Sequence, residues 1–242
     1  MIIALMMGRA GSKGLKNKNL IKIKGKRLFE YPLIAATKSK LVSKIFISTD
    51  CSVIKKTAKK YNAEIIDRPK KLASAKALGE DVYEHGYKEI KKRLGKKNKI
   101  KYIILLMANS PTISSNLIKK GIKILDKNNK YDSAVTTSVY NMWSPLRARK
   151  LTKEGFLKPF VPFNTFGNPK KLNCDRDSQG DVYYADMAMS IVRPHCLENI
   201  KSGLLPQKWM GHKIAPIKSE AGLDVDYEWQ LPQVEYWIKK KI

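Results

Sequence analysis

Short apolar runs alternate with amphipathic segments through the first 140 residues, and this alternation limits the fold more than any other feature of the chain. The runs are continuous, as in strands buried on both faces of a sheet. They predict strands over residues 2–7, 45–48, 63–66, 102–107 and 133–139. The segments between them predict helices over residues 31–40, 52–61, 80–94 and 115–127. We therefore expect an α/β fold, with a mostly parallel sheet covered by helices on both faces.

The regular pattern breaks after about residue 140. Residues 141–180 are aromatic, basic and interrupted by prolines, and no helix is evident among them. The sheet pattern returns over 181–192 and 213–217, and Pro232 marks the start of a last helix. Aromatic residues in an irregular segment indicate burial against a second subunit. We predict a single domain over residues 1–242, with residues 140–180 as an excursion used for dimerisation.

Three polar residues are candidate helix caps, because a side-chain oxygen can accept from a free N–H of the first helical turn. Asp50 or Ser52 could cap the helix over 52–61. Ser114 could cap the helix over 115–127.

The net charge raises the question of a nucleic-acid partner. The chain carries 48 lysines and arginines against 21 acidic residues, a formal charge of +27. Only eight of the basic residues are arginines, which nucleic-acid readers favour for phosphate and guanine contacts. The lysines are spread over nearly every predicted helix. We therefore expect no nucleic acid among the partners and interpret the charge as an aid to attracting an anionic substrate.

The cysteines and the amino terminus bear on location. Cys51, Cys174 and Cys196 are odd in number, widely spaced and in no metal-ligand pattern, which predicts a reducing, cytoplasmic environment without a disulfide framework. No run reaches the roughly 18 apolar residues of a membrane span. Arg9 and Lys13 follow the first apolar run instead of preceding it, unlike the charges of a signal peptide. We expect no membrane contact.

A basic, glycine-rich loop follows the first predicted strand directly. Its glycines would let backbone N–H groups approach phosphate oxygens, and Arg9, Lys13 and Lys18 would add positive charge. The loop lacks the closing Gly-Lys-Ser/Thr of a Walker A motif and the Gly-x-Gly-x-x-Gly spacing of the dinucleotide fingerprint. On the residues alone, two interpretations stay open: a phosphate-binding loop or an ordinary basic turn.

Five motifs, in order along most of the chain, resemble those of the acylneuraminate and related sugar-acid cytidylyltransferases, which include the CMP-Kdo synthetases. They are RAGSKG with KNL (9–14 and 18–20), ISTD (47–50), DRPKKLAS (67–74), NSP (109–111) and DVD (224–226). The resemblance implies a three-layer, Rossmann-like nucleotide-diphospho-sugar transferase fold and a homodimer. It also implies transfer of CMP from CTP to the anomeric hydroxyl of a 2-keto sugar acid, with Mg²⁺ as cofactor and pyrophosphate as product.

The resemblance further implies roles for individual residues. The nucleotide would be bound by Arg9, Ala10, Gly11, Ser12, Lys18, Asn19 and Arg68. The sugar acid would be bound by Asn109, Ser110, Arg176 and Asp186. Catalysis would depend on Arg9, Lys18, Asp224 and Asp226. For Arg68 the alternative is an exposed salt bridge beside a turn proline.

Asp224 and Asp226 are the predicted metal ligands. In an extended segment, side chains two residues apart point the same way, so both carboxylates would converge. Converging carboxylates repel each other unless a cation lies between them, and hard oxygen ligands suit Mg²⁺. The alternative is that Asp226 caps the last helix.

The sequence departs from the family pattern at three places. These departures affect the residues expected to bind the sugar more than those expected to bind the phosphates. Met7-Gly8 replaces the usual Pro-Ala or Leu-Ala before Arg9. Met107 replaces a glutamine associated with sugar recognition, and Asp186-Met187 replaces an Asn-Gly pair. A thioether offers none of the hydrogen-bonding groups of an amide. We predict a nonulosonic acid other than N-acetylneuraminate, of legionaminic or pseudaminic type, or an octulosonic derivative, used in surface-glycan biosynthesis.

Two other functions stay open at this point. One is a nucleotidyltransferase of the same fold that uses another nucleotide or a sugar-1-phosphate. The other is a non-catalytic nucleic-acid-binding or scaffold protein, which would bind polynucleotides with a steep salt dependence.

Overall fold

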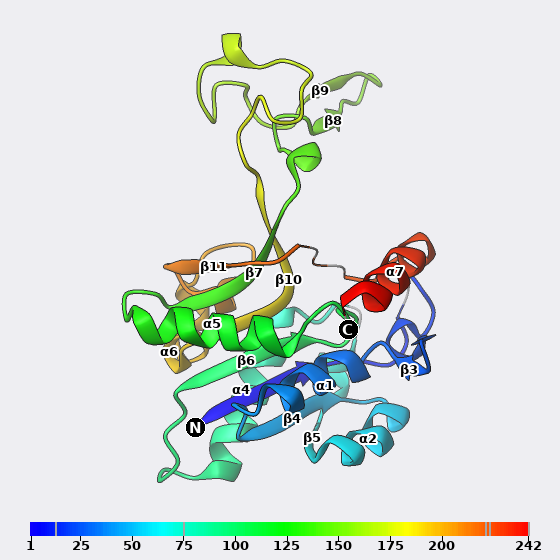
Figure 1. Cartoon of the computed structure of the whole chain (residues 1–242), viewed down its shortest axis with the longest axis vertical. Helices are drawn as coiled ribbons and strands as arrows, with labels where there is room; N and C mark the ends of the chain where they lie inside the picture. Colours follow the sequence, from blue (N-terminus) through cyan, green and yellow to red (C-terminus); the bar gives the residue numbers. More distant parts are fainter. Residues whose placement is uncertain (13, 75, 221, 223, 242) are drawn as a thin grey trace.

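A seven-stranded sheet forms the centre of the molecule (Figure 1). The computed structural model describes residues 1–12, 14–74, 76–220, 222 and 224–241. The strands of the sheet, in spatial order, are β11 (Ile214–Lys218), β7 (Ser133–Val139), β10 (Tyr183–Val192), β6 (Tyr102–Met107), β1 (Ile2–Met7), β4 (Lys44–Thr49) and β5 (Ala63–Asp67). Within this sheet, β10 runs antiparallel to both neighbours, β6 and β7, and the other pairings are parallel. The predicted mostly parallel sheet is confirmed.

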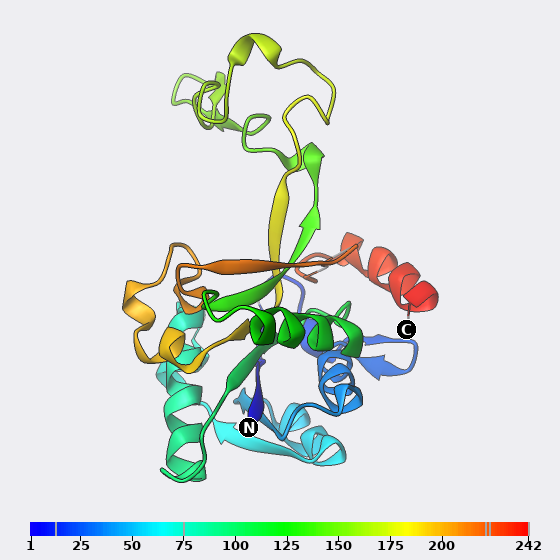
Figure 2. The same cartoon turned by 60° about the vertical axis from the view of Figure 1, so that its left-hand side comes forward.

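Helices cover both faces of this sheet, which gives three layers (Figures 1 and 2). The α-helices of the described residues are α1 (Glu30–Ser39), α2 (Ser52–Ala58), α3 (Lys70–Ala73), α4 (Gly79–Leu94), α5 (Ser115–Lys127), α6 (Pro194–Glu198) and α7 (Leu231–Lys241), and five of them pack on the sheet. Apolar side chains of α1, α2 and α5 pack on one face. Those of α4 and α6 pack on the other. The sheet is therefore buried on both sides, as its continuous apolar strands require.

The predicted cap of α5 is confirmed, and the predicted caps of α2 are wrong. Ser114 Oγ accepts from Leu117 N at 3.3 Å at the start of α5. The cap position of α2 is Cys51, whose side chain makes no capping hydrogen bond. Asp50 instead accepts from Ala10 N at 2.9 Å, so its carboxylate serves the first loop.

A small third cluster lies beside α7. The hairpin of β2 (Lys22–Ile23) and β3 (Lys26–Arg27) contributes Ile23, and α7 contributes Val234 and Ile238. Val225 is fully buried in the same cluster. This packing ties the segment before α7 to the amino-terminal part of the chain.

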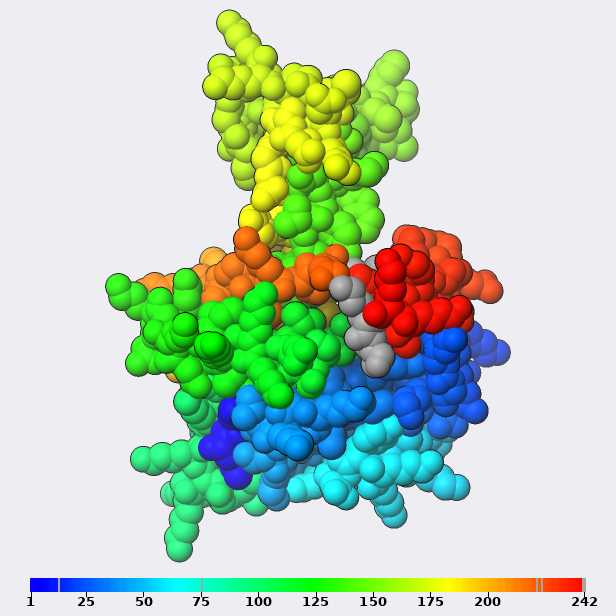
Figure 3. All heavy atoms as spheres, in the orientation of Figure 1, coloured from blue at the N-terminus to red at the C-terminus, as the bar shows by residue number. Residues whose placement is uncertain are grey.

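Residues 140–182, here called the arm, stand well away from the sheet on the extended ends of β7 and β10 (Figures 2 and 3). The arm contains a short hairpin of β8 (Arg149–Leu151) and β9 (Leu157–Pro159) and short 3-10 turns. Its large exposed apolar side chains are Met142, Trp143, Leu151, Phe156, Leu157, Phe160, Phe163 and Phe166. The excursion was predicted at 140–180; its use in dimerisation stays a prediction.

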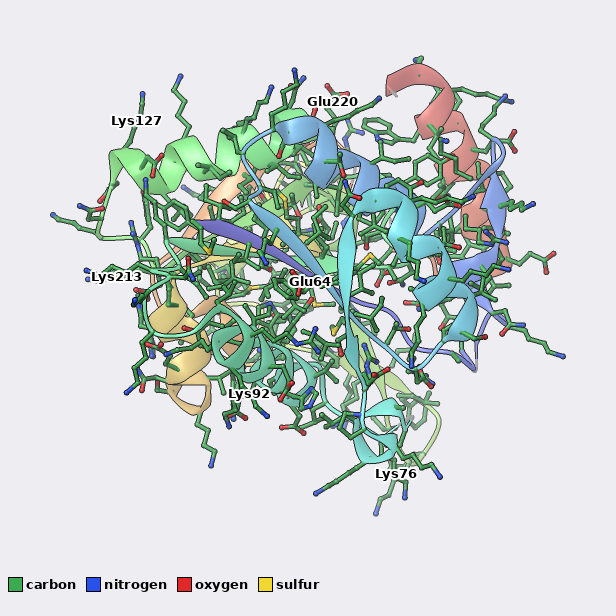
Figure 4. All side chains as sticks on the ribbon, turned by 90° about the horizontal axis from the view of Figure 1, so that it is seen from below. Glu64, Lys76, Lys92, Lys127, Lys213 and Glu220 are labelled. Carbon is green, nitrogen blue, oxygen red and sulfur yellow. The ribbon has the colours of Figure 1, made fainter. Side chains whose placement is uncertain are left out.

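The lysines are dispersed over the surface. In Figure 4 the labelled Lys76, Lys92, Lys127 and Lys213 come from separate parts of the chain and lie around the periphery of the molecule. Among the described residues, no helix has the length and apolar character to span a bilayer.

Candidate functional site

A pocket of about 400 Å³ lies at the carboxyl ends of the parallel strands. Its walls include the residues that follow β1, β5 and β6. After β1 the chain builds β4 and β5 on one side and β6 on the other, so β1 and β6 flank the point where strand order reverses. Open α/β sheets bind ligands at this position. Predicted site residues in the pocket wall are Arg9, Ser12, Lys18, Asn19, Arg68, Asn109 and Asp226.

The loop after β1 is held in place by its own polar groups. Asn19 Nδ2 donates to Arg9 O at 3.1 Å, and Arg9 Nη1 donates to Gly11 O at 3.0 Å. Gly11 has a φ of 65°, a backbone conformation that glycine adopts without strain. The N–H of Ala10 is taken by Asp50. Lys13 lies outside the described residues.

This loop directly contacts the part of the chain that carries Asp224 and Asp226, here called the acidic segment. Lys18 Nζ forms an ion pair with Asp226 Oδ1 across 208 residues of sequence. A Cβ added at Gly14 would lie 3.1 Å from Asp226 O, so only glycine allows the two backbones this approach without displacement. The two ends of the predicted site are therefore adjacent. Asp226 does not cap a helix: Tyr227 holds the cap position of the next turn.

Asp224 is fixed by Asn109, the predicted sugar ligand at the end of β6. Asn109 Nδ2 donates to Asp224 Oδ1 and, at 3.1 Å, to Val225 O. Val225 N returns a hydrogen bond to Asn109 O at 3.0 Å. Because Val225 points into its apolar cluster, its neighbours Asp224 and Asp226 are both directed away from that cluster.

The environment of Asp224 disfavours its charged form. Burial, followed by the negative charge of Asp226, raises the pKa of Asp224 to about 6, against the lowering effects of Lys18 and Asn109. A cation placed between two such carboxylates would relieve both the desolvation and the repulsion. The described residues contain no group of three His, Cys, Asp or Glu side chains arranged for a metal. Asp224 and Asp226 are the residues here that could hold such a cation.

Arg68 is buried, with only 9% of its surface exposed, so the alternative of an exposed salt bridge is wrong. Its Nη2 donates to Ser48 O at 2.6 Å and its Nε to Ser48 Oγ at 3.3 Å, at the end of β4. Burial lowers the pKa of the Arg68 guanidinium, and Asp50 opposes that shift. The guanidinium thus lies in the pocket wall with charge available to an anion.

The remaining predicted sugar ligands are not in the pocket wall. Ser110 is fully buried next to Asn109, and its hydroxyl has no hydrogen-bond partner among the described residues. Arg176 lies in the arm and its Nε donates to Asp177 at 3.3 Å. Asp186 is buried in β10.

Sequence reasoning missed Tyr83, which contacts the pocket-lining residue Met107. Its hydroxyl donates to Met107 Sδ at 3.5 Å, and its ring packs edge-on against Trp209 with centroids 5.3 Å apart. Both rings are nearly completely buried. In the sequence Tyr83 is one of several apolar residues on the inner face of a helix, and no local pattern distinguishes it from the others.

Comparisons with known proteins agree with this geometry. The cytidylyltransferase family model matches residues 3–154. The chain is 31% identical over 140 residues to the N-acylneuraminate cytidylyltransferase of Escherichia coli, a match that covers 58% of this chain and 32% of that protein. It is 33% identical over 150 residues to a Helicobacter pylori protein named pseudaminic acid cytidylyltransferase and UDP-2,4-diacetamido-2,4,6-trideoxy-β-L-altropyranose hydrolase, a match that covers 62% of this chain and 28% of that protein. The match thus spans about a third of each of these two curated relatives.

A further relative and a solved structure extend the comparison. Over 64 residues the chain is 45% identical to the CMP-N,N'-diacetyllegionaminic acid synthase of Campylobacter jejuni, which covers 26% of this chain and 27% of that protein. The structure of a CMP:2-keto-3-deoxy-manno-octonic acid synthetase complexed with CTP covers 100% of this chain and 99% of its own, with a TM-score of 0.68 and 14% identity. At that identity the likeness concerns the fold. Since the family model matches well over half of the sequence, the chain belongs to the cytidylyltransferase family.

Proposed function

We propose that this protein transfers CMP from CTP to the anomeric hydroxyl of a 2-keto sugar acid and releases pyrophosphate. The observation that carries the proposal is the meeting of the basic loop after β1 with the acidic segment before α7, at Lys18 and Asp226. A cationic loop and the carboxylate of Asp226 line one pocket, and Asp224 is bonded to the wall residue Asn109. This arrangement suits a nucleoside triphosphate bound with a divalent cation.

In this reaction the oxygen of the sugar hydroxyl attacks the α-phosphorus and the hydroxyl proton passes to solvent. The bond from that phosphorus to the α,β-bridging oxygen breaks, and pyrophosphate leaves. Arg9, Lys18 and Arg68 would hold and neutralise the phosphate oxygens. Such a transfer depends mainly on holding the reactants in line. The hydrogen bonds within the loop after β1, and those of Asn109 to Asp224 and Val225, would contribute to this. Asp224 and Asp226 would hold Mg²⁺, which when bound would offset the charge of the triphosphate.

For the acceptor we propose a nonulosonic acid other than N-acetylneuraminate. The support is the apolar Met107 in the pocket wall, where the family has a glutamine, together with the names of the relatives, which act on neuraminic, pseudaminic and legionaminic acids. Of the predicted sugar residues, we retain Asn109, Ser110 and Arg176 in this proposal; the contacts of Asp186 are taken up in the next subsection. The sugar would serve a surface glycan.

The test is a pyrophosphate-release assay with CTP, UTP, GTP and ATP, each paired with a panel of 2-keto sugar acids and with a sugar-1-phosphate. We expect release with CTP and a diacylated nonulosonic acid, abolished by EDTA and restored by Mg²⁺. Faster turnover of another nucleotide, or release only with the sugar-1-phosphate, would refute the assignment.

We also propose a homodimer formed through the arm, in a cytoplasmic protein. The arm exposes more large apolar side chains than a monomer of this size needs to present to water, and such patches mark interfaces. The three cysteines are free thiols, which supports a reducing compartment.

A further inference from the structure

Asp186 is a buried carboxylate whose oxygens are already occupied. It is 6% exposed and lies where β10 has an irregular register against β7. Its Oδ1 accepts from Thr136 Oγ1 and, at 3.1 Å, from Ala188 N. Its Oδ2 accepts from Ser138 Oγ at 3.3 Å. No ion pair to Asp186 occurs among the described residues, so these hydrogen bonds are what hold the carboxylate in place.

Ser138 connects Asp186 to the chain that leads into the acidic segment. Its hydroxyl donates to Asp186 and accepts from Gly222 N at 3.0 Å. One residue earlier in β7, Thr137 O accepts from Ser219 N at 2.8 Å. The chain that leads to Asp224 is therefore bonded to β7 at two points.

Gly222 lies so close to Asp186 that no side chain fits between them. A Cβ built on Gly222 would be 1.8 Å from Asp186 Oδ2 and 1.9 Å from its Cγ. Gly222 thus covers the carboxylate on the side of the acidic segment. A sugar ligand could reach these oxygens only after Gly222 moved away and the bonds to Ser138 were broken.

We propose that Asp186, Ser138 and Gly222 form a platform that positions Asp224 toward the pocket and thereby sets the affinity for metal-bound CTP. This inference rests on the proposed function. The platform holds the acidic segment on the β7 side, and Asn109 holds it on the β6 side. Asp186 is then a positioning residue and does not contact the sugar.

The test compares two buried serines of the same strand. Ser138 and Ser133 are 1% and 0% exposed, and each makes a hydrogen bond to backbone; Ser133 Oγ donates to Met210 O at 2.6 Å, at the opposite end of β7. We would measure Mn²⁺ binding in the presence of CTP by electron paramagnetic resonance, and CTP binding with and without metal by calorimetry. These readouts do not depend on turnover.

We expect Ser138→Ala to weaken metal-dependent CTP binding about 10-fold, the lower end of the loss seen when a group that supports metal ligands is removed. Ser133→Ala should keep the wild-type affinity despite a similar drop in melting temperature. Gly222→Ala should weaken metal-dependent CTP binding at least as much as Ser138→Ala. Asp186→Asn, which keeps the shape of the side chain and an acceptor oxygen, should bind CTP with metal about as tightly as the wild type. Asp186→Ala should lose as much of this affinity as Ser138→Ala.

Equal affinities for Ser138→Ala and Ser133→Ala, in a wild type that binds metal and CTP, would overturn the platform and leave the proposed function intact. An Asp186→Ala variant that raises only the KM for the sugar acid would also overturn it, in favour of a sugar contact. Absence of metal-dependent CTP binding in the wild type would overturn both proposals.

Discussion

At the residue scale, Asp224 is unusual because two other carboxylates act on it. Burial and Asp226 raise its pKa to about 6, and Asp186 adds to the shift. Lys18 and Asn109 stabilise the charged form but do not cancel the rise. This environment supports the proposal that Asp224 binds a cation.

This raised pKa predicts the pH dependence of metal-bound CTP. Below about pH 6 Asp224 becomes protonated and loses the charge that a metal requires. Affinity for Mn²⁺ with CTP should therefore fall about 10-fold per pH unit below that value, because the proton and the metal compete. Calorimetric titrations between about pH 5 and 8 would show the fall. Asp224→Asn should bind weakly at every pH; a wild type with flat affinity across this range would contradict the assignment.

The same shift has a consequence for stability without metal. Since the native state binds this proton more tightly than the unfolded state, the contribution of Asp224 to the free energy of unfolding decreases as pH rises from its ordinary pKa of 3.8 to about 6. Urea unfolding of the metal-free protein should show this decrease. It should be smaller in Asp224→Asn.

A second residue-scale prediction compares two aspartate–lysine pairs. Asp226 pairs with Lys18 in the pocket, and Asp67 pairs with Lys55 on the surface. Asp226→Asn should lower kcat/KM by about 100-fold or more, since it removes a proposed metal ligand. Asp67→Asn should stay within about twofold, because exposed ion pairs contribute little. Similar effects of the two changes in steady-state kinetics would argue against Asp226 as a ligand.

At the element scale, the regular elements were predictable because their apolar patterns are local. The strands over 2–7, 102–107 and 133–139 have the predicted bounds. The cap of α2 was not predictable, because whether Asp50 caps its own helix or serves Ala10 depends on a loop far away in sequence. The two-residue strands β2 and β3 are too short to carry a periodic signal.

One irregularity of β10 carries its own prediction. Met187 has a φ of 56°, in the left-handed region that favours glycine. Met187→Gly should therefore be more stable than Met187→Ala by about 1 kcal/mol, the reverse of their usual order, because both lose the side chain and only alanine keeps the strain. Urea unfolding of the two variants measures the difference. If Met187→Ala had a free energy of unfolding equal to or higher than that of Met187→Gly, the backbone would not be strained at this position.

At the scale of the whole molecule, the arm stands out because many of its large apolar side chains are exposed and not packed against the rest of the chain. Phe156, Phe160 and Phe166 are each more than 60% exposed. Changing all three to Ser should convert a dimer into a monomer at micromolar concentration, seen by analytical ultracentrifugation, because it removes apolar area from the proposed interface. Lys153, Lys158 and Lys170 changed together to Ser should leave the dimer intact. If the phenylalanine variant remained a dimer, the dimer interface would not be formed by these side chains of the arm.

The site as a whole follows from the sequence only in part. The basic loop could be suspected of binding phosphate from its glycines and charges, but its partner is 208 residues away and no local pattern links the two. The resemblance to the family supplied that link. The resemblance did not indicate the proposed platform, because Ser138 and Gly222 belong to none of the quoted motifs. Their proposed roles depend on contacts that form only in the folded chain.

The direct contact between Gly14 and Asp226 has a consequence for synthesis of the protein. A ribosome releases the basic loop early, and Asp226 follows Lys18 by 208 residues. During that interval the growing polypeptide can form most of its sheet, yet it lacks half of the machinery that proposed catalysis requires. The proposed nucleotide turnover should accordingly begin only with molecules whose translation has passed the acidic segment.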